Sequence, residues 1–428
     1  HAWPERPVFH FTASNVSPEQ NRRRLIDEIA RWTGRNLRPE DYPTWRTVFR
    51  LLFGLRPETP FVLVLDEVQY LAPKRDDLSE VASELNAVYE EDLGREAGLL
   101  VVLSGSAVRT LEALAGGGAP LYGRLDWSHE LAPFDYFDAA RMVPDYGPED
   151  QIRTYAAFGG TPLYLDRVDT TRPLSENIVD AVLAQDGVVR GQMESLIEQE
   201  VGLRDVATYR GILASIGQKR LEIGEIAANL GREVGTGLRR MLDQLVELGY
   251  LQARRNFEAA ANQPYRYRLG DPALRFYHGL VLPNESAIDT AGAEAVWRER
   301  LAPQTWPTYV GQHVFEEVVE QAYLRHQRHL EIPIVEEWGQ WQGKDRNRRS
   351  LELDAVCRLL DGGVLTGSMK FRAEEADATV WTDHVNALER LRDSGHGWAR
   401  EALERDAPFL FVSRAGFSDS FREVRQRE

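Results

Sequence analysis

The sequence has little of what membrane and disulfide-stabilised proteins need. Among its 428 residues there is one cysteine, Cys357, which excludes an internal disulfide framework and a zinc site built from several thiolates. No apolar run approaches the roughly 18 residues that a membrane-spanning helix requires. The longest apolar segments, FVLVL and GLLVVLSGSAV, have the length of strands. We therefore expect a protein of the reducing cytoplasm with no membrane partner.

An excess of positive charge is also absent, since the formal net charge is −16. This balance argues against a chain coated with basic residues for nucleic-acid binding, although it leaves room for a local basic patch. Hydrophobic residues make up 43% of the chain, which is enough for sizeable cores. The length favours about three domains, at roughly 150 residues each.

The third absence is a G-x-x-x-x-G-K-[ST] segment, the loop whose backbone N–H groups and lysine hold nucleotide phosphates. GQWQGKD at 339–345 has a different spacing. Yet FVLVLDEVQYLA at 61–72 is an apolar strand that ends in Asp66 and Glu67, as in nucleotide-hydrolysing proteins. In that interpretation Asp66 holds Mg²⁺ through water and Glu67 polarises the attacking water. The alternative is that Asp66 only caps the turn that follows.

The N-terminal third alternates strands and helices, which predicts an α/β fold with a parallel, doubly wound sheet. Ligands of such sheets bind beyond the carboxyl ends of the strands. Ser104 and Ser106 follow the third strand and could sense a γ-phosphate, or cap the next helix. Arg124 could reach a phosphate, in cis or from a neighbouring subunit, or lie on the surface. The expected strands are 7–14, 61–68 and 98–106, and the expected helices are 17–34, 44–55 and 76–94.

The middle of the chain predicts helices and then a winged helix-turn-helix, with YLQARR and YRYRL as its hairpin. Residues 204–275 contain 12 basic and 8 acidic residues, a local excess of +4 that phosphate contacts require. Winged helices also serve as protein-interaction modules or ATPase lids, and that alternative stays open. The candidate DNA-binding residues are Arg232, Arg239, Arg240, Arg254 and Arg255.

From about residue 296 the pattern is again α/β, after a polar segment, 284–295, that we expect to be a linker. SLELDAVCRLL and GVLTGSMKF predict two strands joined by a DGG turn. A helix and a final strand, PFLFVSRAGF, follow.

Several segments in this order resemble the archaeal-type ATPase family of the P-loop, AAA+-like group. They are FVLVLDEVQYL, LLVVLSGSAVRTLEAL, APLYGRL…ELAPFDYFDA, YAAFGGTPLYL, LGYLQARR…YRYRLGDPALRFYHGLV and VGQHVFEEVVEQ…ELDAV. The resemblance implies a P-loop NTPase-like parallel sheet, an α-helical and winged-helix module, and a C-terminal restriction-endonuclease-like domain. It also implies ATP and Mg²⁺ as cofactors. In this family a phosphate-binding loop precedes the first strand found here, so we expect that loop upstream of His1.

The resemblance divides the chain into four parts. These are an AAA+-like core without its P-loop (1–145), a helical lid (146–205), the winged helix (206–283) and the nuclease-like domain (284–428). We expect an ATPase whose nucleotide state repositions the last two, with DNA as a candidate partner. The alternative is a non-enzymatic regulatory adaptor for DNA or protein, and the oligomeric state is left open.

The nuclease-like domain carries an incomplete set of metal ligands. The resemblance implies that Asp354 stands where a metal-binding carboxylate would, that Glu316 could be another ligand, and that Lys370 could stabilise charge on a phosphate or help to orient water. The acid expected two residues before that lysine is Ser368, so one hard ligand for Mg²⁺ is missing. Glu352 shares a strand face with Asp354 and could compensate. We do not expect nuclease activity.

Overall fold

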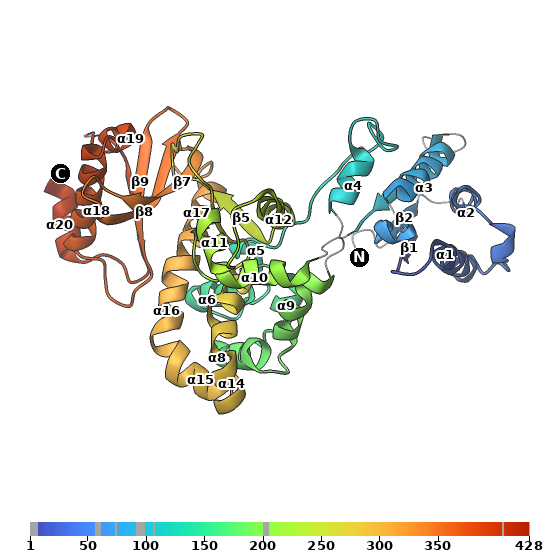
Figure 1. The fold of residues 1–428 in the computed structure, drawn as a ribbon, viewed down its shortest axis with the longest axis horizontal. Helices are drawn as coiled ribbons and strands as arrows, with labels where there is room; N and C mark the ends of the chain where they lie inside the picture. The colour runs from blue at the N-terminus through green and yellow to red at the C-terminus, as the bar shows by residue number, and fades with distance from the viewer. Residues whose placement is uncertain are drawn as a thin grey trace. The chain divides into compact units, whose positions relative to one another are not determined.

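The computed structural model describes residues 7–55, 61–72, 75–90, 99–105, 108–199, 205–404 and 406–427. The chain divides into two compact units, residues 1–131 and 132–428, which are described separately below. Figure 1 shows the first unit in blue to cyan and the second in green to red.

The first unit contains a parallel three-stranded sheet with β2 between β1 and β3. The strands are β1 (Val8–Thr12), β2 (Phe61–Asp66) and β3 (Leu99–Leu103). The helices are α1 (Pro18–Thr33), α2 (Trp45–Phe53), α3 (Arg75–Val88) and α4 (Val108–Ala115), with short 3₁₀ turns η1 (Pro39–Asp41) and η2 (Val68–Leu71). The parallel α/β arrangement predicted from the sequence is confirmed for this unit.

The two faces of this sheet differ in burial. Phe9 and Leu63 are almost fully buried, in one core with Leu25 and other apolar residues of α1, α2 and α3. On the opposite face, by the alternation of a strand, Val8 and Leu100 are 46% and 41% exposed. One face of the sheet therefore anchors the helices, and the other presents apolar side chains at both edge strands.

The second unit begins with helices and contains the predicted winged helix. The first helices are α5 (Tyr136–Ala140), α6 (Pro148–Phe158), α7 (Pro162–Leu165), α8 (Leu174–Ile178), η4 (Val179–Leu183) and α9 (Val188–Gln199). The winged helix follows as α10 (Val206–Ile216), β4 (Leu221–Glu222), α11 (Ile223–Asn229), α12 (Thr236–Glu247), β5 (Leu251–Arg254) and β6 (Arg266–Leu269). Its three strands are antiparallel in the order β4-β6-β5, so the predicted helices and hairpin are confirmed.

A run of short helical segments connects the winged helix to the last part of the chain. The segments are α13 (Pro272–Phe276), η5 (Tyr277–Val281), η6 (Leu282–Asn284), α14 (Glu285–Ala291), α15 (Ala293–Val296), η7 (Trp297–Thr305), α16 (Trp306–Tyr309) and η8 (Val310–Val314). The prediction of a linker at 284–295 is therefore wrong. Ile288 is 3% exposed and Val296, directly after the stretch, is 5% exposed, so this polar segment is packed on the core.

The last part is α/β, as predicted. Its helices are α17 (Phe315–His326), α18 (Ala378–Asp393), α19 (Gly397–Glu401) and α20 (Asp419–Arg427). Its strands are β7 (Val335–Lys344), β8 (Ser350–Leu359), β9 (Val364–Lys370) and β10 (Phe409–Ser413), in the order β10-β9-β8-β7. β7, β8 and β9 are antiparallel, whereas β10 runs parallel to β9. Gly362, at φ 88°, forms the turn between β8 and β9.

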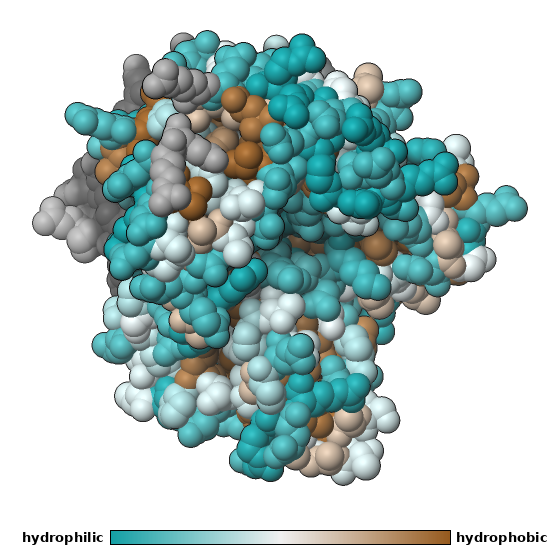
Figure 2. Space-filling model, turned by 90° about the vertical axis from the view of Figure 1, so that its left-hand side faces the viewer, coloured by the Kyte–Doolittle hydropathy of each residue, from teal (hydrophilic) through white to brown (hydrophobic). Residues whose placement is uncertain are grey.

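Hydrophilic residues dominate the face of the molecule shown in Figure 2, with hydrophobic residues in smaller groups between them. Within the described ranges, no helix combines the length and the apolar character needed to cross a bilayer.

Candidate functional site

The ends of the three parallel strands bring polar side chains together in the first unit. Thr12 pairs in register with Asp66, and the backbone N–H of Ser104 donates to the Leu65 carbonyl at 3.0 Å. Thr12, Asp66 and Ser104 thus lie at one edge of the sheet because parallel strands end on the same side. Sequence patterns predicted Asp66 and Ser104 at this edge but did not identify Thr12.

The Asp66 carboxylate is fixed by hydrogen bonds and remains reachable. Ser104 Oγ donates to Oδ1 at 2.6 Å, and the backbone N–H of Glu67 donates to the same oxygen at 3.0 Å. Thr12 Oγ1 donates to Oδ2 at 3.4 Å, and His10 Nε2 lies 4.0 Å from Oδ2. The Asp66 side chain is 32% exposed. These donors orient the carboxylate, and its exposed fraction leaves it accessible to a ligand.

Glu67 adopts an unusual backbone conformation. Its φ of 54° and ψ of 43° lie in the left-handed region, which costs energy for a residue with a Cβ. The Val68 N–H donates to the Ser104 carbonyl at 3.1 Å, which ties the turn after β2 to the end of β3. Gln69 Nε2 donates to the Glu67 carboxylate. The turn therefore holds the second acid of the pair beside the first.

Two further residues beside this turn, Asn21 and Gly105, were not singled out from the sequence. Asn21 of α1 is fully buried, and its Nδ2 donates to the carbonyls of Ser14 and Tyr70 at 2.8 and 2.7 Å. A Cβ at Gly105 would come within 2.2 Å of the Gln69 amide oxygen, so glycine permits the close approach there. A buried asparagine inside an otherwise apolar helix stripe was the available signal for Asn21.

The structure says less about Ser106 and Arg124, the two other residues predicted for the nucleotide site. Ser106 lies outside the described residues. Arg124 Nη1 lies 2.9 Å from Glu90 Oε1, just after α3. That ion pair between half-exposed partners is weak, so it does not lock the arginine in place.

The donor set at the strand ends fits Mg²⁺. The hydroxyl and carboxylate oxygens of Thr12, Asp66 and Ser104 are hard ligands of the kind that Mg²⁺ takes, directly or through water. Within the described ranges, this edge contributes no lysine or glycine-rich loop that could hold the phosphates. The residues present therefore match the metal side of a nucleotide site.

The candidate metal cluster of the C-terminal part is centred on Asp354 of β8. Its Oδ2 accepts the Met369 N–H at 2.7 Å and the Ser368 hydroxyl at 3.2 Å, and it lies 3.4 Å from Lys370 Nζ. The structure thus brings together Asp354 and Lys370, as predicted. Ser368 stands where a second acid was expected, and its hydroxyl donates to the Asp354 carboxylate.

Glu316 and Glu352 are joined by a cation from the winged helix. Arg220 Nη2 lies 3.1 Å from Glu316 Oε2, and its Nη1 lies 3.5 Å from Glu352 Oε1. Burial, and then the charge of Asp354, raise the pKa of Glu316 to about 7. A guanidinium thus sits between two of the carboxylates considered as ligands. The described ranges contain no group of three or more His, Cys, Asp or Glu residues arranged to hold a metal ion.

The predicted DNA-binding arginines fall into two groups. Arg239 and Arg240 on α12 are exposed. Arg232 Nη2 donates to Thr208 Oγ1 at 2.7 Å, and Arg254 forms two 2.9 Å hydrogen bonds with Glu320 of α17. Arg255 stacks on the ring of Tyr265, at 4.1 Å from its centroid. The structure therefore leaves Arg232, Arg239 and Arg240 exposed and pairs Arg254 of the wing with the C-terminal part.

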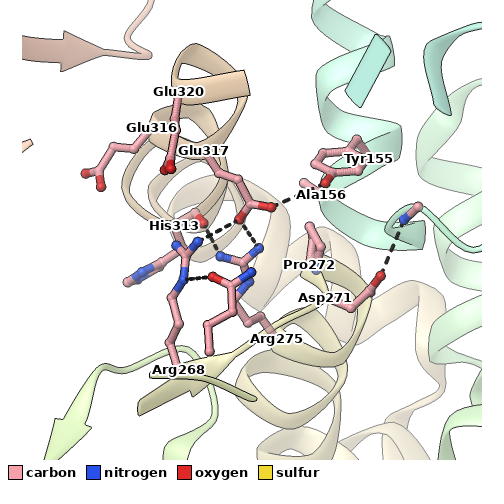
Figure 3. A network of polar contacts seen from close by, with 12 residues as sticks. Tyr155, Ala156, Arg268, Asp271, Pro272, Arg275, His313, Glu316, Glu317 and Glu320 are labelled. Atoms are coloured by element: carbon pink, nitrogen blue, oxygen red, sulfur yellow. Dashed lines mark hydrogen bonds and ion pairs between the residues drawn. The ribbon is translucent and has the colours of Figure 1, made fainter. Parts of the chain in front are cut away.

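A buried ionic network, shown in Figure 3, joins the winged helix to α17. Glu317 Oε2 accepts from Arg275 Nη2 at 2.5 Å and from Arg268 Nη2 at 3.3 Å, and Tyr155 OH donates to Oε1 at 3.3 Å. Although burial opposes ionisation, Arg275 and Arg268 lower the pKa of Glu317. Sequence reasoning missed this network because its members are 42 to 162 positions apart.

The comparisons with known proteins give a distant likeness of architecture. No family model matches the sequence, and no curated protein matches it. A Walker-type ATPase of Pyrococcus abyssi is similar at 22% identity and a TM-score of 0.41, over 64% of this chain and 81% of that one. ORC2 of Aeropyrum pernix, solved as ADPNP–ADP complexes, is similar at 16% identity and a TM-score of 0.41, over 67% of this chain and 79% of that one. ORC1 of Aeropyrum pernix, solved in complex with DNA, is similar at 16% identity and a TM-score of 0.31, over 65% of this chain and 80% of that one. At these values the similarity concerns the fold alone.

Proposed function

We propose that the chain binds ATP with Mg²⁺ at the carboxyl ends of β1, β2 and β3 and hydrolyses it there. The observation that carries the proposal is the Asp66 carboxylate, held by Ser104 at 2.6 Å and still partly exposed, with Glu67 next to it. A strand-end carboxylate held in place by hydrogen bonds, beside a second acid, is what metal-assisted phosphoryl transfer to water requires.

Asp66, Ser104 and Glu67 each have a proposed task at this edge. Asp66 holds the metal through water, and Ser104 keeps that carboxylate oriented and senses the terminal phosphate. Glu67 accepts a hydrogen bond from the attacking water and orients it. Mg²⁺, when bound, neutralises charge on the phosphate oxygens. Ser106 and Arg124 remain proposed phosphate contacts.

The phosphate cradle is proposed to come from a segment outside the described residues. Val8 at one edge of the sheet and Leu100 and Val102 at the other are 46%, 41% and 36% exposed. A doubly wound sheet packs helices on both faces, so this apolar face is suited to a further strand and helix that carry the phosphate loop.

Contact with DNA is the proposed role of the winged helix. The exposed pair Arg239 and Arg240 on α12 supports it, because a recognition helix presents such side chains to phosphates or bases. The proposed consequence is that nucleotide state controls how the winged helix and the C-terminal part engage DNA.

A second candidate is a regulatory adaptor that binds nucleic acid without catalysis. Ser368 beside Asp354, and Arg220 between Glu316 and Glu352, favour it for the C-terminal part. In this candidate a module of nuclease-like architecture serves binding only. Incubation of the full-length protein with DNA and Mg²⁺ or Mn²⁺ tests this role, since cleavage that is lost in Asp354→Ala would establish a nuclease and contradict binding alone.

The proposed ATPase is tested by steady-state turnover of the full-length protein. Glu67→Gln is expected to lower kcat by about 10²–10⁴-fold while the protein still binds ATP, because general-base assistance is worth that much. Glu80→Gln, at an exposed position of α3, is the matched control and is expected to leave turnover unchanged. Equal rates for the wild type and Glu67→Gln would remove Glu67 from the mechanism.

A further inference from the structure

A recess lies in unit 132–428, between the β5–β6 hairpin of the winged helix and β7. It has a volume of about 360 Å³. Its charged lining consists of Arg220, Arg254, Arg255, Arg266, Arg268 and a single carboxylate, that of Glu337. Five guanidinium groups around one concave surface are unusual in a chain with a net charge of −16.

The walls of this arginine pocket are fixed by hydrogen bonds between the two modules. The Phe257 N–H donates to the Gln340 carbonyl at 2.9 Å. The Asn256 amide bonds the backbone of Gln342 in both directions, at 2.9 and 3.0 Å. Arg266 Nη1 donates to the Gln342 side chain at 2.6 Å. The pocket is therefore preformed, and a ligand would not need to organise it.

Most of the arginines are held by carboxylates that do not line the pocket. Arg220, Arg254 and Arg268 pair with Glu316, Glu320 and Glu317 of α17, at 3.1, 2.9 and 3.3 Å. These three glutamates follow one another on α17, as Figure 3 shows. The carboxylates of α17 therefore orient these guanidinium groups from outside the pocket, and the arginines themselves line it.

Arg255 differs from the other four. Within the described ranges it has no carboxylate partner, and its guanidinium is carried on the ring of Tyr265. Its buried Nε has no hydrogen-bond acceptor there. The charge of this arginine is therefore positioned by an aromatic ring but not neutralised, which is the state expected of a side chain that meets an anion from outside.

The electrostatics of the cluster agree with this geometry. Burial lowers the pKa of Arg268 to about 9, with Glu317 opposing this shift and the nearby cations Arg275, Arg220 and Arg254 contributing to it. An anion in the pocket would relieve this repulsion between like charges.

We propose that the arginine pocket binds a phosphate group, presented either by a nucleic-acid strand or by free polyphosphate. Guanidinium forks match the tetrahedral oxygens of phosphate and form two hydrogen bonds at once. Trp338, also in the lining, offers a ring on which a base could stack. This site is separate from the nucleotide site proposed at the ends of β1 to β3 and needs neither Mg²⁺ nor ATP.

The test is fluorescence anisotropy of a labelled single-stranded DNA oligonucleotide with the full chain, in EDTA and without ATP. Arg255→Gln is expected to weaken binding about tenfold, the effect of losing one charge-assisted contact. Arg298→Gln is the matched control, because Arg298 is exposed, lies outside the pocket lining and pairs with Glu299. Arg255→Lys keeps the charge without the fork and is expected to give an intermediate affinity, which also covers the case that the glutamine variant fails to fold.

Inorganic pyrophosphate distinguishes the two sources. If it binds the wild type, displaces the oligonucleotide and loses affinity in Arg255→Gln, free polyphosphate is a ligand of the pocket. If only the oligonucleotide responds to the substitution, the phosphate belongs to a strand. Equal weakening by Arg255→Gln and Arg298→Gln, or no change with either ligand in Arg255→Gln, would overturn the proposal. Because ATP and Mg²⁺ are absent, failure here leaves the nucleotide site untouched.

Discussion

Replacement of Glu317 by glutamine is the perturbation whose size follows most directly from the structure. Glu317 neutralises Arg275 and Arg268, whose side chains are 2% and 8% exposed. Glutamine keeps the shape and a hydrogen-bond acceptor but leaves two buried cations without their counter-ion. Breaking a buried pair in this way costs about 3–5 kcal/mol of unfolding free energy.

The assay is urea denaturation of the full chain followed by tryptophan fluorescence. Glu320→Gln serves as the matched control on the same helix, because its partner Arg254 is 43% exposed and only that one guanidinium loses its counter-ion, so the loss there should be smaller than at Glu317. If the two substitutions cost the same, the network in Figure 3 does not stabilise the junction between the winged helix and α17.

The difference in stability between the wild type and Glu317→Gln should depend on pH. The folded-state pKa of Glu317 lies below its ordinary value of 4.5, so its contribution to stability is present above pH 4.5 and disappears as the pH falls through the lowered value. The wild type should lose its advantage over Glu317→Gln only in acid. An advantage that grows on acidification would contradict this assignment.

Two other substitutions test separate parts of the account. Glu316→Gln should become more stable relative to the wild type as the pH rises from 4.5 to 7, because the pKa of Glu316 is raised to about 7 and ionising it in the folded state is unfavourable. Urea midpoints of both proteins at pH 5 and pH 8 check this. A difference in stability that stays constant with pH would contradict it. Asn21→Leu should destabilise residues 7–131 by about 2–3 kcal/mol, because the buried carbonyls of Ser14 and Tyr70 lose their donor. Hydrogen exchange of peptides from α1 and η2 measures that loss, with Glu19→Gln at an exposed position of α1 as control, and unchanged protection in Asn21→Leu would show that Asn21 does not brace the turn.

The sequence predicted those features that depend on local pattern. Continuous apolar runs such as FVLVL predicted the parallel strands, although Leu100 and Val102 of β3 are exposed on one face, and the Gly-rich DGG turn predicted the β8–β9 hairpin. The placement of Asp66 and Ser104 at one edge followed from strand direction alone. What the pattern could not give was pairing between distant segments.

The features that were missed all arise from tertiary contacts. Glu317 looks like one of several surface acids in VFEEVVEQ, and only the fold brings Arg268 and Arg275 to it. The polar composition of 284–295 suggested a linker, although Ile288 alone is enough to anchor α14 in the core. Arg254 was predicted from its local charge as a DNA contact, and the structure pairs it with Glu320 across 66 positions.

The central claim is that the acids at the end of β2 face a magnesium–nucleotide complex. Its most direct test is isothermal titration of the full-length protein with ATP, with and without Mg²⁺, beside Asp66→Asn. The account predicts that Mg²⁺ tightens ATP binding to the wild type at least about tenfold, as one metal contact to a carboxylate would, and that Asp66→Asn abolishes this gain. ATP affinity that is indifferent to Mg²⁺, or an equal gain in Asp66→Asn, would contradict it.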